Sequence, residues 1–196
     1  AYLLRWAGPV WESDDPYTNR YGVLNYSLVS DEFQPQYHVQ QMRIVPARTG
    51  ALDNEALKRA ILEFGGLYAT MKLYTPYYTY KGKTYLVPYW NTNGAYYCPE
   101  TGAGHAVTLV GWDDDYPKEN FNSEYRPKGN GAFIVKDSYG TETPRDNGYI
   151  YVSYYDTTFA YSESYAFPQL EDTDNYATIY QYDTLGLVDS YVSLSS

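Results

Sequence analysis

Histidine is scarce in this chain, and one of its two histidines, His105, begins the apolar segment HAVTLVGW. A second apolar segment, AFIVKD, ends in Asp137, 32 residues downstream. If the two segments are neighbouring strands, the imidazole and the carboxylate lie side by side. A carboxylate that accepts a hydrogen bond from one ring nitrogen fixes the tautomer and makes the other nitrogen a better proton acceptor. The pair is therefore a candidate general base with its orienting group.

A histidine that precedes an apolar strand is more often a packed or capping residue than a catalyst. Neighbouring residues favour the chemical interpretation here. Gly102 and Gly104 allow the backbone to approach another group closely, and Tyr139, just after Asp137, can cover the pair from water. Both interpretations stay open on these residues alone.

A base of this kind needs a nucleophile, and the sequence offers two weak candidates. Ser138 follows Asp137 but lacks the strained GxSxG turn of serine hydrolases. Cys98, the single cysteine, is followed by Pro-Glu-Thr-Gly rather than by a helix whose N-terminal dipole would lower the thiol pKa. We therefore expect no nucleophile in this chain and interpret Cys98 as a free or intermolecular thiol.

Other polar residues predict neither a metal nor a cofactor. His38, in QPQYHVQQ, has no convergent acid in the sequence pattern, and we interpret it as structural. The run 113–115 consists of three aspartates but lacks the spacing and the glycine of a calcium-binding hand. We interpret this run as a solvated turn.

Composition excludes several classes of function. The formal net charge is −10, which argues against a nucleic-acid partner because no basic patch can form. No apolar run approaches the ~20 residues that span a bilayer, and a single cysteine excludes an internal disulfide framework. The chain starts at AYLLRWAGPVW without a signal peptide, so we expect any secretion signal to have been removed.

Tyrosine is the compositional outlier, with 27 residues against 14 lysines and arginines together. Its ring packs while its hydroxyl stays wet, which suits half-exposed strands and interfaces, and we interpret this composition as extracellular. One tyrosine-rich run can line a peptide groove or serve packing and interfaces equally well: Tyr74, Tyr77, Tyr78 and Tyr80.

One helix and several strands must position these residues. LDNEALKRAILEFGG predicts a helix over about 53–64, because its apolar residues recur at helical spacing and two glycines end it. Residues 74–101 are expected to be a loop or hairpin region with a turn at Lys81-Gly82. Strands are expected over 39–45, 67–73, 105–112, 132–137 and 148–155. One helix followed by antiparallel strands predicts an α+β fold dominated by β-structure.

These motifs resemble those of the papain-like cysteine peptidases. HAVTLVGWDDD matches the family's His-Ala-Val-x-x-Val-Gly-Tyr/Trp strand, which carries the catalytic histidine. FIVKDSYG stands where the family has Lys-Asn-Ser-Trp-Gly, followed by a Gly-Tyr strand. The match is ordered and correctly spaced over about residues 50–156. The flanks GPVWESDDPY and IYQYDTLGL are more similar to the bacterial and archaeal surface branch, in which a lectin-like domain accompanies the peptidase.

The resemblance implies the β-dominated lobe of a papain-like fold, with antiparallel strands in a twisted sheet or partial barrel and one main helix. It implies that residues 1–158 form the C-terminal, β-rich lobe. The family's nucleophile-bearing N-terminal half is expected to be absent, because no Gln-Gly-x-Cys-Gly-Ser-Cys-Trp segment occurs. We interpret residues 159–196 as a tyrosine-rich extension or the start of a following domain.

Carried over residue by residue, the resemblance makes His105 the general base and thiolate partner, Asp137 its orienting group and Tyr139 the shielding aromatic. Asp137 and Tyr139 stand where the family has asparagine and tryptophan. A carboxylate stabilises imidazolium more strongly than an amide does, which widens the pH range of a thiolate–imidazolium pair, but the change can equally mark a site relieved of selection. By position alone, the substrate pocket includes Ala69, Thr70, Gly104 and Ala106.

Two functions follow from these residues. The first is the histidine-bearing part of an extracellular or cell-surface cysteine peptidase that acts on a peptide or protein, with the cysteine supplied by a segment outside this chain, such as a companion chain. The chain alone would then be inactive. The second is a catalytically inactive, peptidase-derived surface or assembly protein, which the missing nucleophile and the tyrosine excess favour. Carbohydrate binding through the tail is a third function, and it rests only on the lectin-like association.

Overall fold

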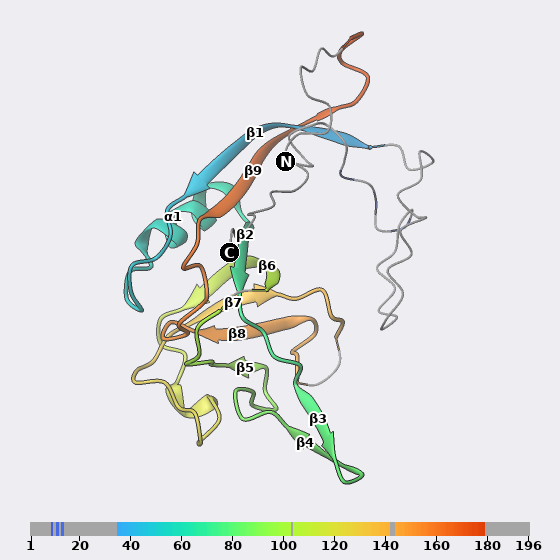
Figure 1. The fold of residues 1–196 in the computed structure, drawn as a ribbon. Helices are drawn as coiled ribbons and strands as arrows, with labels where there is room; N and C mark the ends of the chain where they lie inside the picture. The colour runs from blue at the N-terminus through green and yellow to red at the C-terminus, as the bar shows by residue number, and fades with distance from the viewer. Residues whose placement is uncertain are drawn as a thin grey trace, which may run out of the picture. The chain divides into compact units, whose positions relative to one another are not determined.

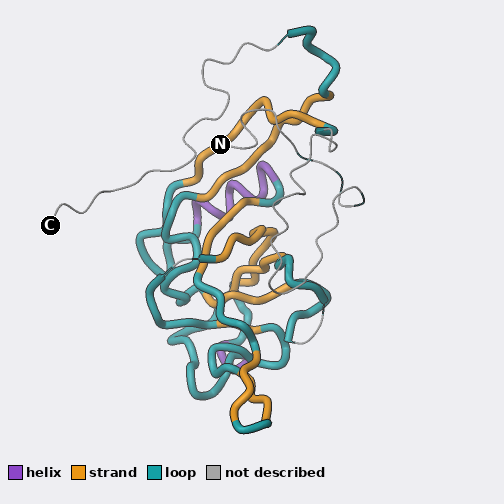
Figure 2. The backbone as a smooth tube through the Cα atoms, turned by 45° about the vertical axis from the view of Figure 1, so that its right-hand side comes forward, coloured by secondary structure: helices purple, strands orange, loops and turns teal. Residues whose placement is uncertain are grey.

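The computed structural model describes residues 9, 11, 13, 35–102, 104–141 and 144–178. The chain divides into two units, Ala1–Met42 with Phe167–Ser196 and Arg43–Ala166. The elements in chain order are β1 Tyr37–Val45, α1 Glu55–Phe64, β2 Leu67–Met71, β3 Tyr77–Tyr80, β4 Lys83–Leu86, β5 Ala95–Tyr96, β6 His105–Asp113, the 3₁₀ helix η3 Lys118–Asn120, β7 Ala132–Lys136, β8 Tyr149–Ser153 and β9 Ser164–Asp172 (Figure 1). Figure 2 shows how strongly strands and loops predominate over helix.

A seven-stranded sheet in the order β1-β9-β2-β6-β7-β8-β5 forms the framework. Within Arg43–Ala166, β2, β6, β7 and β8 pair antiparallel, each with the next. The short strand β5 pairs parallel with β8, so the sheet is mixed rather than purely antiparallel. The predicted fold class is confirmed: an α+β lobe dominated by β-structure, with one main helix and an open sheet rather than a closed barrel.

Helix α1 packs its apolar stripe on the sheet, where it contacts β2 and β6. Leu57, Ala60 and Ile61 are buried, and burial of a leucine or isoleucine side chain contributes roughly 1.5–3 kcal/mol. The helix ends at Gly65, whose φ of 82° suits glycine and whose N–H donates to the Ile61 carbonyl at 2.8 Å. Its N-cap is Asn54, whose side chain makes no capping hydrogen bond.

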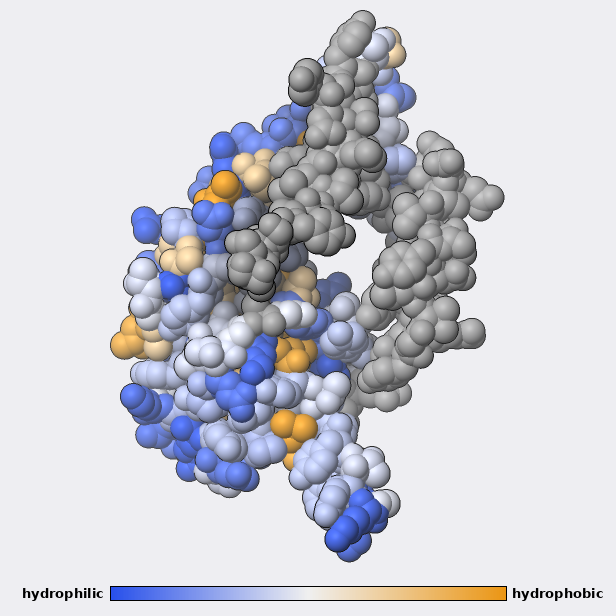
Figure 3. Space-filling model, viewed as in Figure 1, coloured by the Kyte–Doolittle hydropathy of each residue, from blue (hydrophilic) through white to orange (hydrophobic). Residues whose placement is uncertain are grey.

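Strands β3 and β4 form a separate two-stranded sheet that projects from the second unit (Figures 1 and 2). The predicted turn is present, with Lys81 and Gly82 at φ 48° and 74°, as in a type I′ hairpin. Tyr78 and Tyr85 stack across the strands with ring centroids 5.4 Å apart. Figure 3 shows this hairpin as a largely hydrophilic projection, so its tyrosines belong to an exposed surface.

Strands β5 and β9 were not predicted from the sequence. The first has only two residues, which is too short for a periodic signal. The second begins inside the region interpreted as an extension. Phe159, Ala160 and Ala166 are buried in the core of the second unit, so the chain after residue 158 still completes that core. The boundary at residue 158 stays a prediction, and the extension beyond residue 178 lies outside the described residues.

Across the parts of the chain that the structure describes, no helix is long and apolar enough to cross a membrane.

Candidate active site

The register of β6 and β7 brings the predicted site residues together. The strands pair antiparallel with Thr108 opposite Lys136. Continued past the end of β7, this register places Tyr139 opposite His105 and Asp137 diagonal to it. Because side chains alternate along a strand, His105 and Asp137 point to the same, core-facing side of the sheet.

His105 and Asp137 form a hydrogen-bonded pair with the imidazole Nε2 2.8 Å from the carboxylate Oδ1. An ionised carboxylate only accepts, so Nε2 carries the hydrogen and Nδ1 is the nitrogen free to exchange a proton. Nδ1 has no hydrogen-bond partner among the described residues. The side chains are 12% and 0% exposed respectively, so the bond forms in largely dry surroundings, where it is stronger than in water.

Arg145 forms an ion pair with the second carboxylate oxygen of Asp137. Its Nε donates to Asp137 Oδ2, and its side chain is only 7% exposed. Burial of Asp137 raises the pKa of its carboxyl, but the hydrogen bonds from His105 and Arg145 outweigh burial and hold that pKa below its ordinary value. The carboxylate is therefore charged at neutral pH.

An Asn-Gly turn before β8 explains how Arg145 reaches the site. Asn147 and Gly148 have φ of 52° and 90°, and the flanking Asp146 and Tyr149 exchange two backbone hydrogen bonds of 2.9 Å. This is the geometry of a tight hairpin, for which Asn-Gly is the preferred sequence. The turn folds Arg145 back toward the end of β7. Arg145 was not predicted as a site residue, because the Asn-Gly pair indicates the turn but not the group that the turn brings Arg145 to.

Tyr139 covers the imidazole. Its ring stacks on His105 with centroids 4.9 Å apart and an interplanar angle of 10°. The tyrosine itself is 42% exposed, so it stands between the imidazole and solvent. The structure thus places this residue where a shielding aromatic would lie.

The segment before β6 follows an unusual backbone path. Gly102 and Gly104 have φ of 138° and 150°, a region that favours glycine. A Cβ on Gly102 would lie 3.1 Å from Lys72 Cδ, so this glycine does permit a close approach. Gly104 has no such neighbour and is exposed.

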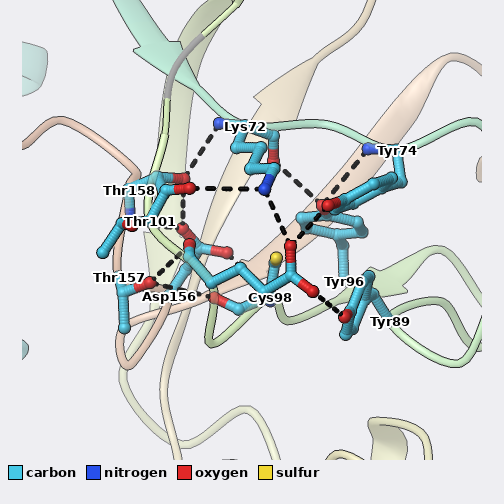
Figure 4. Close-up of polar contacts among 10 residues, drawn as sticks. Lys72, Tyr74, Tyr89, Tyr96, Cys98, Thr101, Asp156, Thr157 and Thr158 are labelled. Carbon is cyan, nitrogen blue, oxygen red and sulfur yellow. Dashed lines mark hydrogen bonds and ion pairs between the residues drawn. The ribbon is translucent and has the colours of Figure 1, made fainter.

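An exposed carboxylate anchors the same segment. Glu100 accepts hydrogen bonds from Lys72 Nζ at 2.8 Å, from Tyr89 Oη at 2.5 Å and from Tyr74 Oη. In Figure 4, dashed lines that end on Lys72, Tyr74 and Tyr89 mark these hydrogen bonds. These bonds, with the one from Lys72 strongest, lower the pKa of Glu100 to about 2. We call these four residues the Glu100 cluster.

Cys98 lies on the core side of this segment (Figure 4). Its N–H donates to Asp156 Oδ2 at 3.0 Å, and its carbonyl accepts from Thr157. Burial raises the pKa of the Cys98 thiol, which keeps it protonated at neutral pH. Both features favour a structural role for this cysteine.

A shallow hollow of about 260 Å³ is lined by Tyr68, Ala106, Val107, Thr108, Lys136, Asp137 and Ser138, so it includes Asp137 of the pair but not His105. Of the four predicted pocket residues, Ala106 lines it. Thr70 lies opposite Ala106 in the sheet and bonds to Ser162 at 2.6 Å. Ala69 is 0% exposed, because alternation along β2 turns it into the core, and its assignment to the pocket stays a prediction.

The remaining polar residues show one difference from expectation. An acid does converge on His38, since Glu171 Oε2 lies 3.8 Å from its Nε2. The aspartate run 113–115 is exposed, and Asp114 bonds to Lys58 Nζ at 2.5 Å. Within the described residues, no group of three or more His, Cys, Asp or Glu side chains is arranged to hold a metal ion.

Comparisons with solved structures find cysteine proteases with a similar fold. The cysteine protease and lectin-like domains of Cwp84, a surface layer associated protein of Clostridium difficile, are 30% identical with a TM-score of 0.72, and the match covers 95% of this chain and 38% of that chain. A clostridial Cwp84 variant after propeptide cleavage is 30% identical with a TM-score of 0.66, over 88% of this chain and 40% of that chain. This chain thus spans well under half of either structure.

More distant structures share the fold. Digestive procathepsin L 3 of Tenebrio molitor larval midgut is 16% identical with a TM-score of 0.51, over 84% of this chain and 45% of that chain. A search of curated proteins found no match.

The family profile described as "Papain family cysteine protease" matches residues 1–167, which include both strands of the His105–Asp137 pair. Sequence, register and fold agree, and the chain belongs to the papain family of cysteine proteases.

Proposed function

We propose that this chain is the histidine-bearing part of a papain-like peptidase that hydrolyses peptide bonds, with the cysteine supplied by a segment outside the chain. The observation that carries the proposal is the geometry of His105. Its Nε2 is held by Asp137 at 2.8 Å, which leaves Nδ1 to face a thiol. A histidine placed only for packing would not need one nitrogen fixed and the other free.

The chemistry follows from that geometry. Nδ1 of His105 takes the thiol proton, and the thiolate attacks the peptide carbonyl carbon. As the carbon–nitrogen bond breaks, the imidazolium gives its proton to the leaving amine, and an acyl thioester remains. Water then attacks the thioester, passing a proton to Nδ1, and the thiol regains it as the acid product leaves. Asp137 keeps the ring oriented throughout, and Tyr139 limits access of water to it.

The peptide would run past the start of β6. Gly104 is exposed there, and Ala106 lines the hollow that also contains the edge of Asp137. A small residue at position 106 leaves room for a substrate side chain. Thr108 and Lys136, which also line the hollow, would border the same side chain.

We also propose an extracellular or cell-surface location. The tyrosine-rich, lysine-poor composition supports it. The similar clostridial protein is described as surface layer associated.

Activity measurements on the purified chain, on native material and on variants of the chain test the proposal. The purified chain should not hydrolyse a fluorogenic peptide library. Native material whose intact mass reveals a companion polypeptide should do so, and a thiol-reactive epoxide or His105→Ala should abolish turnover. Cys98→Ser is the matched control and should leave turnover intact. Turnover by the purified chain that Cys98→Ser abolishes would overturn the proposal.

A second function, an inactive surface or assembly protein, is favoured by the aspartate and tyrosine at positions 137 and 139. Native material that carries a companion polypeptide but shows no turnover sensitive to His105→Ala would establish it.

A further inference from the structure

We infer that Arg145 is a positioning residue for His105: it balances the charge of Asp137, so that the pair replaces the neutral asparagine of papain-like peptidases. The two oxygens of Asp137 are divided between these partners. Oδ1 faces His105 Nε2 at 2.8 Å, and Oδ2 accepts from Arg145 Nε. One buried carboxylate therefore links a ring that exchanges protons to a permanent cation.

The surroundings hold Arg145 in place independently of Asp137. Its guanidinium carbon lies 5.6 Å from the ring centroid of Trp90 and 5.5 Å from that of Tyr139. Trp90 is fully buried, and Tyr139 also stacks on His105. Arginine suits such a position, because its planar cation stacks on aromatic rings while its N–H groups bind a carboxylate.

Few other charges face the imidazole. Asp137 and Arg145 meet its edge, and the ring of Tyr139 covers its face. Lys136 precedes Asp137 in the chain and is exposed at the end of β7. On the neighbouring segments, Lys72 and Glu100 pair with each other at 2.8 Å, so their charges largely cancel.

The charge of Arg145 reduces the preference of the site for the protonated form of His105. A lone buried carboxylate at this distance would shift a histidine's titration by about one to three pH units upward. The arginine opposes that shift from the other side of the same carboxylate. His105 therefore meets a hydrogen-bond acceptor that fixes its orientation without a large net charge. An asparagine provides the same combination with a neutral amide.

Nuclear magnetic resonance titration of the two histidine rings in the full chain tests this inference. Arg145→Gln should raise the titration midpoint of His105 by about one pH unit, and Asp137→Asn should lower it by about the same amount. The double variant Asp137→Asn/Arg145→Gln restores charge balance and should return the midpoint close to that of the unaltered chain. His38 should not move in any variant, and it serves as the internal control.

Arg145→Lys separates charge from packing. It keeps the positive charge but loses the planar stacking, so the chain should lose stability while the His105 midpoint stays in place. If Arg145 has only a structural role, Arg145→Gln and Arg145→Lys should both reduce stability. The titration midpoint of His105 should then not move in Arg145→Gln. If Arg145→Gln does not fold, the charge-balanced double variant and Arg145→Lys still give a decision. A double variant that titrates like Asp137→Asn alone would overturn the inference.

The inference rests on the proposed function for its consequence, since a balanced charge matters to a histidine that exchanges protons. The experiments can refute the inference about Arg145 and the proposed peptidase function independently of each other. Shifted titrations without any turnover sensitive to His105→Ala support the inference and refute the peptidase. Turnover with an unmoved midpoint in Arg145→Gln refutes the inference and leaves the peptidase standing.

Discussion

Two carboxylates near the candidate site, Asp137 and Glu100, make similar contacts in different surroundings. Asp137 bonds to His105 and Arg145 with its side chain 0% exposed, whereas Glu100 bonds to Lys72 and two tyrosines with its side chain 45% exposed. Water and salt can replace a lost partner of Glu100 but not one of Asp137. We therefore expect burial, rather than the number of contacts, to decide which of the two carboxylates contributes more to the stability of the fold.

Removal of Asp137 should have the largest effect. Asp137→Ala leaves Arg145 buried without a counter-charge, and breaking a buried pair in this way costs about 3–5 kcal/mol. Urea unfolding followed by circular dichroism should show that loss in the free energy of unfolding. Asp137→Ala/Arg145→Met removes both charges and should recover most of the loss.

Glu100→Ala is the matched control for that measurement. It removes a carboxylate with three partners rather than two, but this carboxylate is exposed to solvent, so the unfolding midpoint should change far less. Equal losses for Asp137→Ala and Glu100→Ala would break the comparison, because they would mean that burial is not the deciding difference.

The contributions of Asp137 and Glu100 to stability should both depend on pH, but they should respond differently to salt. Both have folded-state pKa values below their ordinary ones, so the unfolded chain takes up a proton at higher pH than the folded chain does. Each contribution to stability is therefore complete above the ordinary pKa and is lost as pH falls through the folded one. For Glu100 that window runs from 4.5 down to about 2.

Urea unfolding between about pH 2 and about pH 6, at low salt and at about 1 M salt, measures these contributions. Salt should remove the difference between the unaltered chain and Glu100→Gln, because the exposed carboxylate is screened. It should leave the difference between the unaltered chain and Asp137→Asn largely intact. A salt-sensitive Asp137 contribution would contradict the dry site that the structure shows.

Local sequence signals predicted the parts of the fold that depend on neighbours in the chain. The helix follows from apolar spacing ended by Gly65, and the β3–β4 turn follows from Lys81-Gly82. The contact between His105 and Asp137 also follows, since two adjacent antiparallel strands leave few registers that keep both apolar faces buried.

The rest depends on contacts that no local pattern encodes. The parallel pairing of β5 with β8 joins residues 56 positions apart through only two register pairs, Ala95 with Tyr151 and Tyr96 with Val152. The side of the sheet on which Ala69 lies depends on strand parity, which the pairing of Ala69 with Val107 of β6 sets. Arg145 reaches the site through a turn whose type was readable but whose target was not.

A third prediction concerns whether the ring of Tyr139 shields His105 from solvent. Tyr139→Ala removes a stacked ring, which should cost about 0.5–1.5 kcal/mol and leave His105 more open to solvent. The rate at which diethylpyrocarbonate modifies His105 should therefore rise, while Tyr139→Trp should keep the rate low. Tyr80→Ala, on the exposed hairpin, is the control and should change neither stability nor rate. An unchanged rate in Tyr139→Ala would show that the backbone, rather than the ring, protects the imidazole.

The smallest effect is expected from Glu100→Gln. The amide keeps the shape but has a single acceptor oxygen, whereas Tyr89 donates to Oε1 and both Tyr74 and Lys72 donate to Oε2. The charge and the hydrogen bonds at one of the two oxygens are therefore lost. The melting temperature should fall by at most about 2 °C at low salt, and the difference should vanish at high salt. Since the Glu100 segment leads directly into His105, a Glu100→Gln variant that shifts the His105 titration would show that the exposed cluster reaches the buried site. An unmoved titration would confine the electrostatics of His105 to Asp137 and Arg145.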